Sequence, residues 1–338
     1  MGNPITEPRI NWKYLNAFAK LVGVLPIGKP LNFYSFTGKD GSEIIAKDDC
    51  PPLYAPWTID FFFLADIHNF GFWNGEEKYE GPLFGTLGGK KVKGSDLLYK
   101  LLLRAFIRDP FELSGPWLRS LSKKRWEEIM TDDNGGVTLL ATNERWELTR
   151  ALGEWFIAHT PPAHMGSRWV ANIVSAFHRP AQQMLSRLTD PVRGVPGFKE
   201  DPLKKKALLF MMTLANRPEH FLIPEKSFVW RPIVDYHLMR LALRLGLVML
   251  PTDWVSENTE RKFTSPKREK AVRRMVFRAV EQIIKKSGRP MAEIDNTMWS
   301  ARRFCQEVEE PNCAQCAFRN SCAQRTELFQ PIIRTTAY

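Results

Sequence analysis

Residues 234–248 read VDYHLMRLALRLGLV, and this stretch decides the fold class of the chain. Its apolar side chains recur three and four positions apart, which is the period of an amphipathic helix. Asp235 stands at the expected start of this helix, where unpaired backbone N–H groups and the helix dipole stabilise a carboxylate. Aspartate is common there simply as a cap. A carboxylate fixed in this way could also stabilise positive charge on a substrate, so Asp235 is both a capping and a catalytic candidate.

The same helical period recurs along most of the chain. It predicts further helices at residues 95–106 (with Ser95 as N-cap), 143–160, 168–188 and 192–217. We expect an interruption near Pro180 and a Gly/Pro turn at the start of 192–217. Strand signals are confined to short pieces around residues 79–93. The sequence therefore predicts a mainly α fold.

The chain has 338 residues, which suggests two lobes or one large helical domain. With 44% hydrophobic and 12% aromatic residues it can bury a sizeable core. Residues 1–50 have no clear period, and we expect residues 1–56 to form an N-terminal segment that wraps a later core. Residues 57–300 form the predicted helical domain, and residues 301–338 form a cysteine-rich loop and tail.

The formal net charge is +11, which favours polyanionic partners such as nucleic acids or nucleotides. The basic segment 267–278 (KREKAVRRMVFR) is either a DNA-facing helix or an ordinary solvated face. No uncharged apolar run reaches about 18 residues, and the N-terminus lacks the apolar stretch of a secretory signal. We therefore expect no membrane partner, a cytoplasmic location and a monomer.

Four of the five cysteines crowd into the tail, with the spacing C-x7-C-x2-C-x5-C: Cys305, Cys313, Cys316 and Cys322. Thiolates in such a set hold zinc or a [4Fe–4S] cluster, and spacing alone does not separate the two. The segment PNCAQCAFRNSC closely resembles the cluster loop of endonuclease III and the adenine glycosylases. The resemblance implies a structural [4Fe–4S] cluster, with zinc as the alternative, and places Arg319 and Arg325 toward a phosphate backbone. Cys50 stands alone and is expected to be an ordinary packed or surface residue.

The segment VDYHLMRLALRLG resembles the helix of the helix-hairpin-helix DNA glycosylase superfamily, in which a V-D-x-H segment presents the catalytic aspartate. VPGFKEDPLKKKA (195–207) resembles a stretched form of the hairpin of that superfamily. The resemblance implies a two-lobed glycosylase-like helical fold in which Asp235 stabilises an oxocarbenium ion and activates water. Lys205 lies where bifunctional members place a Schiff-base lysine. Three consecutive lysines are also typical of a solvated, phosphate-facing patch, so Lys205 is either a lyase residue or a phosphate contact.

A second resemblance covers more of the chain. From about residue 57 onward the sequence is similar to the queuosine salvage family, which hydrolyses queuosine 5′-phosphate, in the segments DIHNFGFW (66–73), SDLLYKLL, NERWELTRALGEW, the DYH helix, 273–295 and FQPIIRTTAY. This resemblance implies a substrate-binding set of Asp66, Asn69, Phe70, Phe72, Trp73, Thr213 and Tyr236. Thr213 stands where the family carries an acidic base contact, a charge that threonine cannot supply. Taken alone, the aromatic run is more typical of plain core.

Two substrate hypotheses follow from the resemblances. The first is a DNA glycosylase that flips out a modified base, bulky or hypermodified, as would suit defence against phage DNA. The alternative is a queuosine 5′-phosphate N-glycosylase that releases queuine for salvage. A third hypothesis is a non-catalytic nucleic-acid-binding module on the same scaffold.

Overall fold

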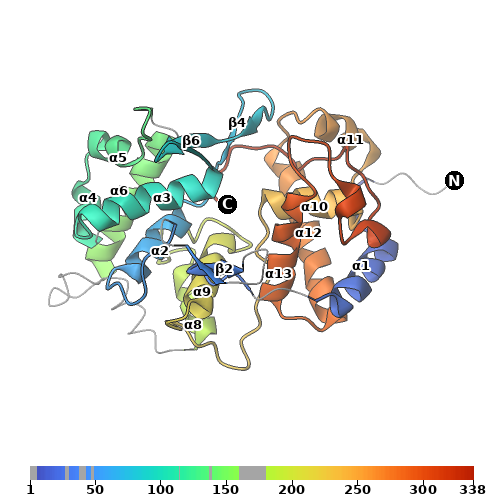
Figure 1. Cartoon of the computed structure of the whole chain (residues 1–338), viewed down its shortest axis with the longest axis horizontal. Helices are drawn as coiled ribbons and strands as arrows, with labels where there is room; N and C mark the ends of the chain where they lie inside the picture. The colour runs from blue at the N-terminus through green and yellow to red at the C-terminus, as the bar shows by residue number, and fades with distance from the viewer. Residues whose placement is uncertain are drawn as a thin grey trace. The chain divides into compact units, whose positions relative to one another are not determined.

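The computed structural model describes residues 6–26, 30–37, 43–46, 49–113, 115–136, 139–159 and 180–338. In this part of the chain the fold is mainly α-helical, as predicted, with a few short two-stranded pairs (Figure 1). None of the described helices is long and apolar enough to cross a membrane. The chain divides into two compact units, each built from segments that are separated in sequence.

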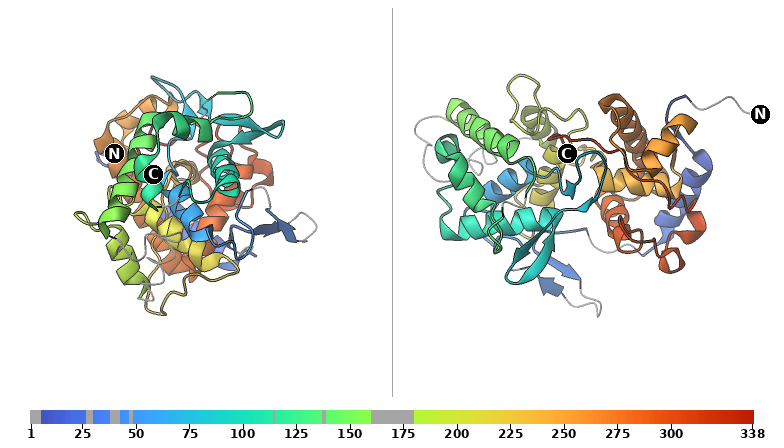
Figure 2. Two further views of the ribbon diagram at one scale, coloured as in Figure 1. Left: turned by 90° about the vertical axis from the view of Figure 1, so that its left-hand side faces the viewer. Right: turned by 90° about the horizontal axis from the view of Figure 1, so that it is seen from above.

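Unit 1 comprises Met1–Pro30, Asn74–Gly81 and Trp230–Arg334. Its elements are β1 (Arg9–Ile10), α1 (Trp12–Val24), α10 (Tyr236–Leu245), β8 (Val248–Met249), α11 (Thr252–Thr259), α12 (Pro266–Ser287) and α13 (Met291–Ser300). β1 pairs antiparallel with β8, and α1 packs against α12, so the amino-terminal helix lies among the carboxy-terminal ones (Figure 2). Within unit 1, the N-terminal segment therefore packs against the C-terminal segment.

Helix α1 corrects the expectation that the N-terminal segment lacks a helical period. Leu15, Phe18, Ala19 and Val22 are buried and recur at helical spacing on one side of the helix. Helix α12 lies within the basic segment 260–288 and covers the candidate basic helix 267–278. Ser265 caps the helix ahead of a proline, and Gly288 ends it in a left-handed conformation.

Helix α10 is the predicted helix of the VDYH segment, and most of its surface is buried. It ends at Gly246, whose φ is 77°. A Cβ at this position would lie 2.5 Å from the Cβ of Ala323, so only glycine fits between the helix end and the cysteine-rich tail. The packing at Gly246 therefore fixes the tail directly beside the last turn of α10.

Unit 2 comprises Leu31–Trp73, Pro82–Val229 and Thr335–Tyr338. Its elements are β2 (Ser35–Thr37), β3 (Glu43–Ile45), α2 (Thr58–Ile67), β6 (Phe84–Leu87), β7 (Lys90–Lys93), α3 (Gly94–Arg108), α4 (Gly115–Ser120), α5 (Lys123–Ile129), α6 (Thr142–His159), α8 (Ala181–Leu188) and α9 (Lys205–Asn216). The short strands β4 (Trp73–Asn74) and β5 (Gly81–Pro82) pair where the chain passes from one unit to the other.

All ten residues of α2 are buried, and the helix packs against α3 and α9 (Figure 1). A helix that is apolar on every side is a core helix.

Three local predictions need correction or restriction. Ser95 is not the N-cap of α3, because the helix begins one residue earlier and Lys93 occupies the cap position. The turn after residue 192 is longer than expected, so α9 begins only at Lys205. Of the predicted helix 168–188, residues 168–179 lie outside the described part, and α8 begins directly after Pro180. The division into segments 1–56, 57–300 and 301–338 remains a prediction.

Candidate functional site

Asp235 is the N-cap of α10. Its Oδ1 accepts a hydrogen bond from the backbone N–H of Leu238 at 2.9 Å, and the residue is half-buried. The expected capping contact is therefore confirmed. The cap occupies one carboxylate oxygen, and among the described residues no hydrogen bond reaches the second. Next to it, the ring of Tyr236 lies 4.2 Å from that of His237, and burial raises the pKa of the Tyr236 hydroxyl, which therefore stays protonated.

A buried ion pair holds the middle of α10. The Nη2 of Arg240 lies 3.2 Å from Oε2 of Glu307, and both side chains are only 3% exposed. Arg240 also donates from Nη1 to Gln330 at 2.8 Å, and the hydroxyl of Tyr79 donates to Glu307. Nδ1 of His237 lies 2.7 Å from the same guanidinium. A buried pair is tolerated only when its remaining groups are satisfied in this way, so α10 is held firmly against the segment that follows Cys305.

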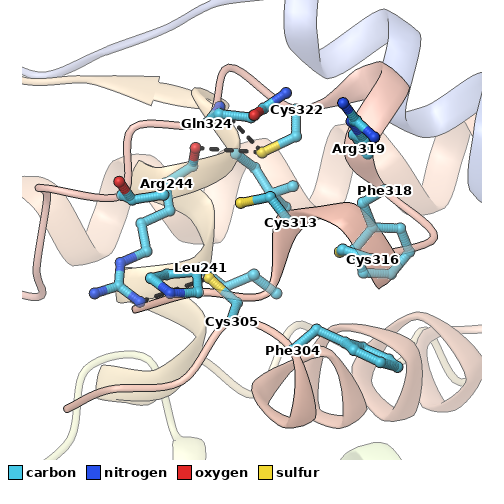
Figure 3. A pocket seen from close by; sticks show the side chains of 13 residues that line it. Leu241, Arg244, Phe304, Cys305, Cys313, Cys316, Phe318, Arg319, Cys322 and Gln324 are labelled. Carbon is cyan, nitrogen blue, oxygen red and sulfur yellow. Dashed lines mark hydrogen bonds between the residues drawn. The ribbon is translucent and has the colours of Figure 1, made fainter. Parts of the chain in front are cut away.

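A second buried arginine, Arg244, holds the last turn of α10. Its guanidinium donates to the carbonyls of Leu328 at 2.8 Å and Gln306 at 2.5 Å. The same group lies 3.6 Å from Sγ of Cys305, within hydrogen-bonding distance of sulfur (Figure 3). The carbonyl of Arg244 accepts from the Cys322 thiol at 3.5 Å. Helix α10 thus connects the Asp235 cap at one end to the cysteine-rich loop at the other.

The four clustered cysteines line one pocket of unit 1, whose walls include Leu241, Phe304 and Phe318 (Figure 3). All four thiols are half-buried and none forms a disulfide. The backbone N–H of Gln324 donates to Sγ of Cys322 at 3.2 Å, a type of contact that also surrounds metal-bound thiolates. Thiol sulfur, which lines this pocket, is the kind of donor that zinc and iron–sulfur clusters take.

The thiols are not gathered as tightly as a single ion requires. Four sulfurs around one zinc ion lie roughly 3.8 Å apart, given Zn–S bonds of about 2.3 Å. In the described part of the chain no three His, Cys, Asp or Glu side chains are grouped to hold a metal ion. Burial raises the pKa of the Cys322 thiol to about 11, so a thiolate there depends on a nearby cation. The observation that favours a bound metal group is therefore that four thiols line one pocket.

The predicted base-pocket residues lie in unit 2, at the end of α2 and in the loop after it. Asp66 is fully buried, and its Oδ1 accepts a hydrogen bond from the Tyr99 hydroxyl at 2.7 Å. Its Oδ2 is buried without a hydrogen-bond partner in the described part of the chain. Burial raises the pKa of this carboxyl to about 7, although Tyr99, Lys205 and Lys206 oppose the shift. Asp66 is therefore poised to be neutral or charged near neutral pH.

Buried cations hold the loop that follows Asp66. Lys206 donates to the Ile67 carbonyl at 2.8 Å, and Lys205 donates to the Asn69 carbonyl at 3.1 Å and to its side-chain oxygen at 2.5 Å. Arg145 donates to the carbonyls of His68 and Phe70. Four consecutive carbonyls, from residue 67 to residue 70, thus accept from buried cationic side chains. This arrangement fixes the backbone of the loop and satisfies acceptors at the end of α2.

Burial strongly perturbs two of these cations. Arg145 is fully buried, and burial lowers its pKa to about 9. Lys206 is also fully buried, and burial, followed by the repulsion of Lys205, lowers its pKa to about 7. The expectation of a solvated lysine patch is wrong for Lys205 and Lys206, since their ammonium groups are bound to buried carbonyls. The role of Lys205 as a lyase or phosphate contact remains a prediction.

The aromatic residues of the loop are packed. Phe70, Phe72 and Trp73 are each at most 5% exposed. The guanidinium of Arg145 lies 4.0 Å from the centre of the Phe70 ring, so one partner of that ring is already a cation. Thr213 is fully buried and donates its hydroxyl to the Leu209 carbonyl of its own helix at 3.0 Å. These contacts agree with the core interpretation of the run, and its role in binding a base remains a prediction.

The segment that resembles a hairpin joins α8 to α9. The N–H of Gly197 donates to Glu200 at 2.7 Å, so this donor is occupied within the loop. Of the two arginines expected to face phosphate, Arg319 is exposed and Arg325 pairs with Glu327. Cys50 is packed, as expected, and burial raises its pKa to about 12.

Sequence reasoning missed several residues that hold these sites, namely Tyr99, Arg145, Lys206, Arg240, Arg244 and Glu307. Arg145 and Arg244 could have been suspected, because each stands on a helix among positions that the apolar period assigns to the core. Asp235, Tyr236 and the clustered cysteines belong to unit 1, whereas the candidate residues between Asp66 and Thr213 belong to unit 2. Compared with known proteins, the chain matches no described family, and no curated protein is similar to it in sequence.

Proposed function

We propose that the protein is an N-glycosidase that hydrolyses a base–sugar bond, with Asp235 as the catalytic carboxylate. One observation carries the proposal: a half-buried carboxylate is fixed at the start of α10 through one oxygen, on a helix held by two buried arginines. Departure of a base builds positive charge on the sugar ring. An anion that needs no reorganisation stabilises that charge, and its second oxygen can orient or deprotonate water.

For the substrate we favour DNA with a modified, bulky or hypermodified base. The net charge of +11 suits a polyanion, and the cysteine loop resembles that of DNA glycosylases. The fold that we propose is accordingly the two-lobed helix-hairpin-helix glycosylase fold. A helical fold with a VDYH helix preceded by a helix–loop–helix segment (α8, α9) supports it.

The second candidate, a queuosine 5′-phosphate N-glycosylase, is favoured by Asp66. This carboxyl is fully buried and retains an oxygen without a hydrogen bond to any described residue, which would suit donor groups on the edge of a base. The longer resemblance supports the same candidate. A non-catalytic nucleic-acid-binding module is the third possibility.

We further propose that Cys305, Cys313, Cys316 and Cys322 hold a [4Fe–4S] cluster, with zinc as the alternative. A pocket lined by all four thiols supports this. The group would act structurally, by fixing the tail against α10. The residues of this chain that would position it are Arg244 and Gln324, through their contacts to sulfur.

The test is mass spectrometry of bases released from queuosine 5′-phosphate, from damaged DNA and from phage DNAs with modified bases. Asp235→Asn should lower the rate of base release from the true substrate by about a hundredfold or more. Asparagine is as good an N-cap as aspartate, so this variant should fold normally. Asp190→Asn is the matched control, since Asp190 also accepts backbone N–H bonds but lies elsewhere. Full activity of Asp235→Asn would refute the mechanism, and no release from any substrate by the unmodified protein would favour the binding module.

A further inference from the structure

One side of α12 carries a row of exposed cations. They follow one another at intervals of three, four, four and seven positions, which places them along a single face of the helix. The row, called here the α12 stripe, consists of Lys267, Lys270, Arg274, Arg278 and Lys285. The opposite side of the helix is apolar and buried, with Val272, Val276 and Ile283 in the core of unit 1. The stripe therefore plays no part in packing.

The cations of the stripe have no acidic partners among the described residues. Glu281 lies on the same face, but it pairs with Arg231 at 3.8 Å. The neighbouring Arg268 forms ion pairs with two nearby acidic side chains, Glu257 at 2.7 Å and Asp253 at 3.5 Å. Glu281 is therefore the one acidic side chain on the face of the stripe among the described residues of α12, and the stripe keeps an excess of positive charge.

The arrangement works against the stability of its own helix. Lys267 and Lys270 lie in the first turns of α12, where the positive end of the helix dipole disfavours cations. Lys270, Arg274 and Arg278 are spaced four residues apart, and like charges at that spacing repel. Only Lys285, in the last turn, is placed where the helix dipole favours a cation. The other four cations neither pack nor stabilise the helix, and an anionic ligand would account for them.

We infer that the α12 stripe docks the phosphate backbone of a nucleic acid. The inference rests on the proposed function for the presence of a nucleic acid and adds the surface that holds it. The stripe is about 27 Å long at 1.5 Å per residue, and phosphates of one DNA strand advance about 3.4 Å each along the axis. Because the strand winds around this axis while α12 is straight, the stripe can follow one strand over only a few phosphates.

An aromatic side chain stands at the far end of the helix. Trp12 is 50% exposed, and the ammonium of Lys286 lies 5.8 Å from its ring centre. An exposed aromatic next to a cation can stack on a base or sugar beside the backbone. A lipid surface fits less well, because a membrane-binding helix exposes an apolar face, whereas the apolar face of α12 is buried in unit 1.

The experiment measures binding of the full chain to a fluorescent 20-base-pair duplex, with no modified base, by anisotropy across a salt series. The stripe variant is Lys270→Gln/Arg274→Gln/Arg278→Gln. The control variant, Lys124→Gln/Arg193→Gln/Lys226→Gln, removes the same charge from exposed positions of unit 2. We expect the stripe variant to bind at least about tenfold more weakly at physiological salt, with a salt slope reduced by about three. The control should keep nearly the slope of the unmodified protein.

Equal effects of the two variants would overturn the inference, because the general field and not the stripe would then bind DNA. Absence of salt-dependent duplex binding by the unmodified protein would also overturn it, as would binding only to phosphatidylserine vesicles. An RNA duplex of the same length distinguishes the two kinds of backbone.

Base release is measured separately. Stripe-dependent binding without base release by the unmodified protein would refute the proposed function but would still support the docking surface. Thermal unfolding should show that the stripe variant is no less stable than the unmodified protein.

Discussion

The guanidinium of Arg244 lies 3.6 Å from Sγ of Cys305 and donates to it, on the same helix that Asp235 caps. Asp235 and Arg244 are nine positions apart, at opposite ends of α10. One end of the helix therefore carries the candidate catalytic carboxylate, and the other end contacts the first cysteine of the candidate metal pocket. Loss of the contacts at the cysteine end should loosen the tail and the helix together.

Arg244→Gln should therefore destabilise the protein. The shorter amide cannot reach Cys305, Gln306 and Leu328 at once, and buried carbonyls left without donors cost about 1–3 kcal/mol each. We expect a loss of about 2–4 kcal/mol in the free energy of unfolding, measured by urea denaturation. Arg325→Gln is the control, because the side chain of Arg325 is exposed and pairs with Glu327 at the surface. Equal stability of the two variants would show that the buried contacts of Arg244 contribute nothing.

A local pattern was sufficient to predict α10. Its apolar residues recur at helical spacing, and this period is visible without reference to the rest of the chain. The start of α3 was misplaced because an N-cap residue needs extended backbone angles of its own. Lys93 has them, with φ −104° and ψ 136°, whereas Ser95 is already inside the helix. Helix α1 was missed although its period is present, since the flanking prolines and glycines dominated the interpretation.

The candidate site could be predicted only in part. Asp235 and the four cysteines were found because their signals are local in sequence. Lys206 and Arg145 were not, because a lysine or arginine is expected in solvent unless a carbonyl far along the chain accepts from it. The partners of Lys206, Ile67 and Thr336, are more than 100 residues away. Contacts of this kind follow from tertiary packing and leave no periodic signal.

Replacement of single cysteines should separate the metal ligands from the isolated thiol. We expect Cys313→Ala or Cys316→Ala to lose most of the bound iron and sulfide and the visible absorption of an iron–sulfur cluster. Cys50→Ala should keep them, because Cys50 is buried in unit 2, away from the cysteine-lined pocket of unit 1. The measurements are metal and sulfide analysis of the protein purified without oxygen. Zinc without iron would select the alternative, and a protein with neither would remove the proposed cofactor.

Asp66 should make stability fall as pH rises from about 4 to about 7. Its pKa rises from the ordinary aspartate value of 3.8 to about 7 in the folded protein, mainly through burial. Within this window the unfolded chain releases the proton and the folded chain keeps it, so the folded state loses about 1.4 kcal/mol of stability per pH unit. Asp66→Asn should remove this slope, as measured by urea denaturation at several pH values. Parallel pH profiles of the variant and the unmodified protein would contradict the shift.

Lys206 should act in the opposite direction at higher pH. Burial lowers its pKa from 10.5 to about 7, so between these values the unfolded chain holds a proton that the folded chain has released. Stability should therefore rise with pH from about 7 to about 10.5. Lys206→Met should flatten this rise, although it also loses two hydrogen bonds to carbonyls and is less stable throughout. The diagnostic is the slope of unfolding free energy against pH; an unchanged slope would show that Lys206 titrates normally.

The pair of Arg240 and Glu307 should show strong coupling in a double-mutant cycle. Glu307→Gln leaves a guanidinium buried without its counter-charge, and Arg240→Met does the same to the carboxylate, so each should cost about 3–5 kcal/mol. The double variant lacks both charges and should cost much less than the sum of the two. Denaturation of the four proteins gives the coupling energy. If the two costs simply add, the ion pair does not hold α10 against the tail, and the rigid support inferred for Asp235 must come from Arg244 alone.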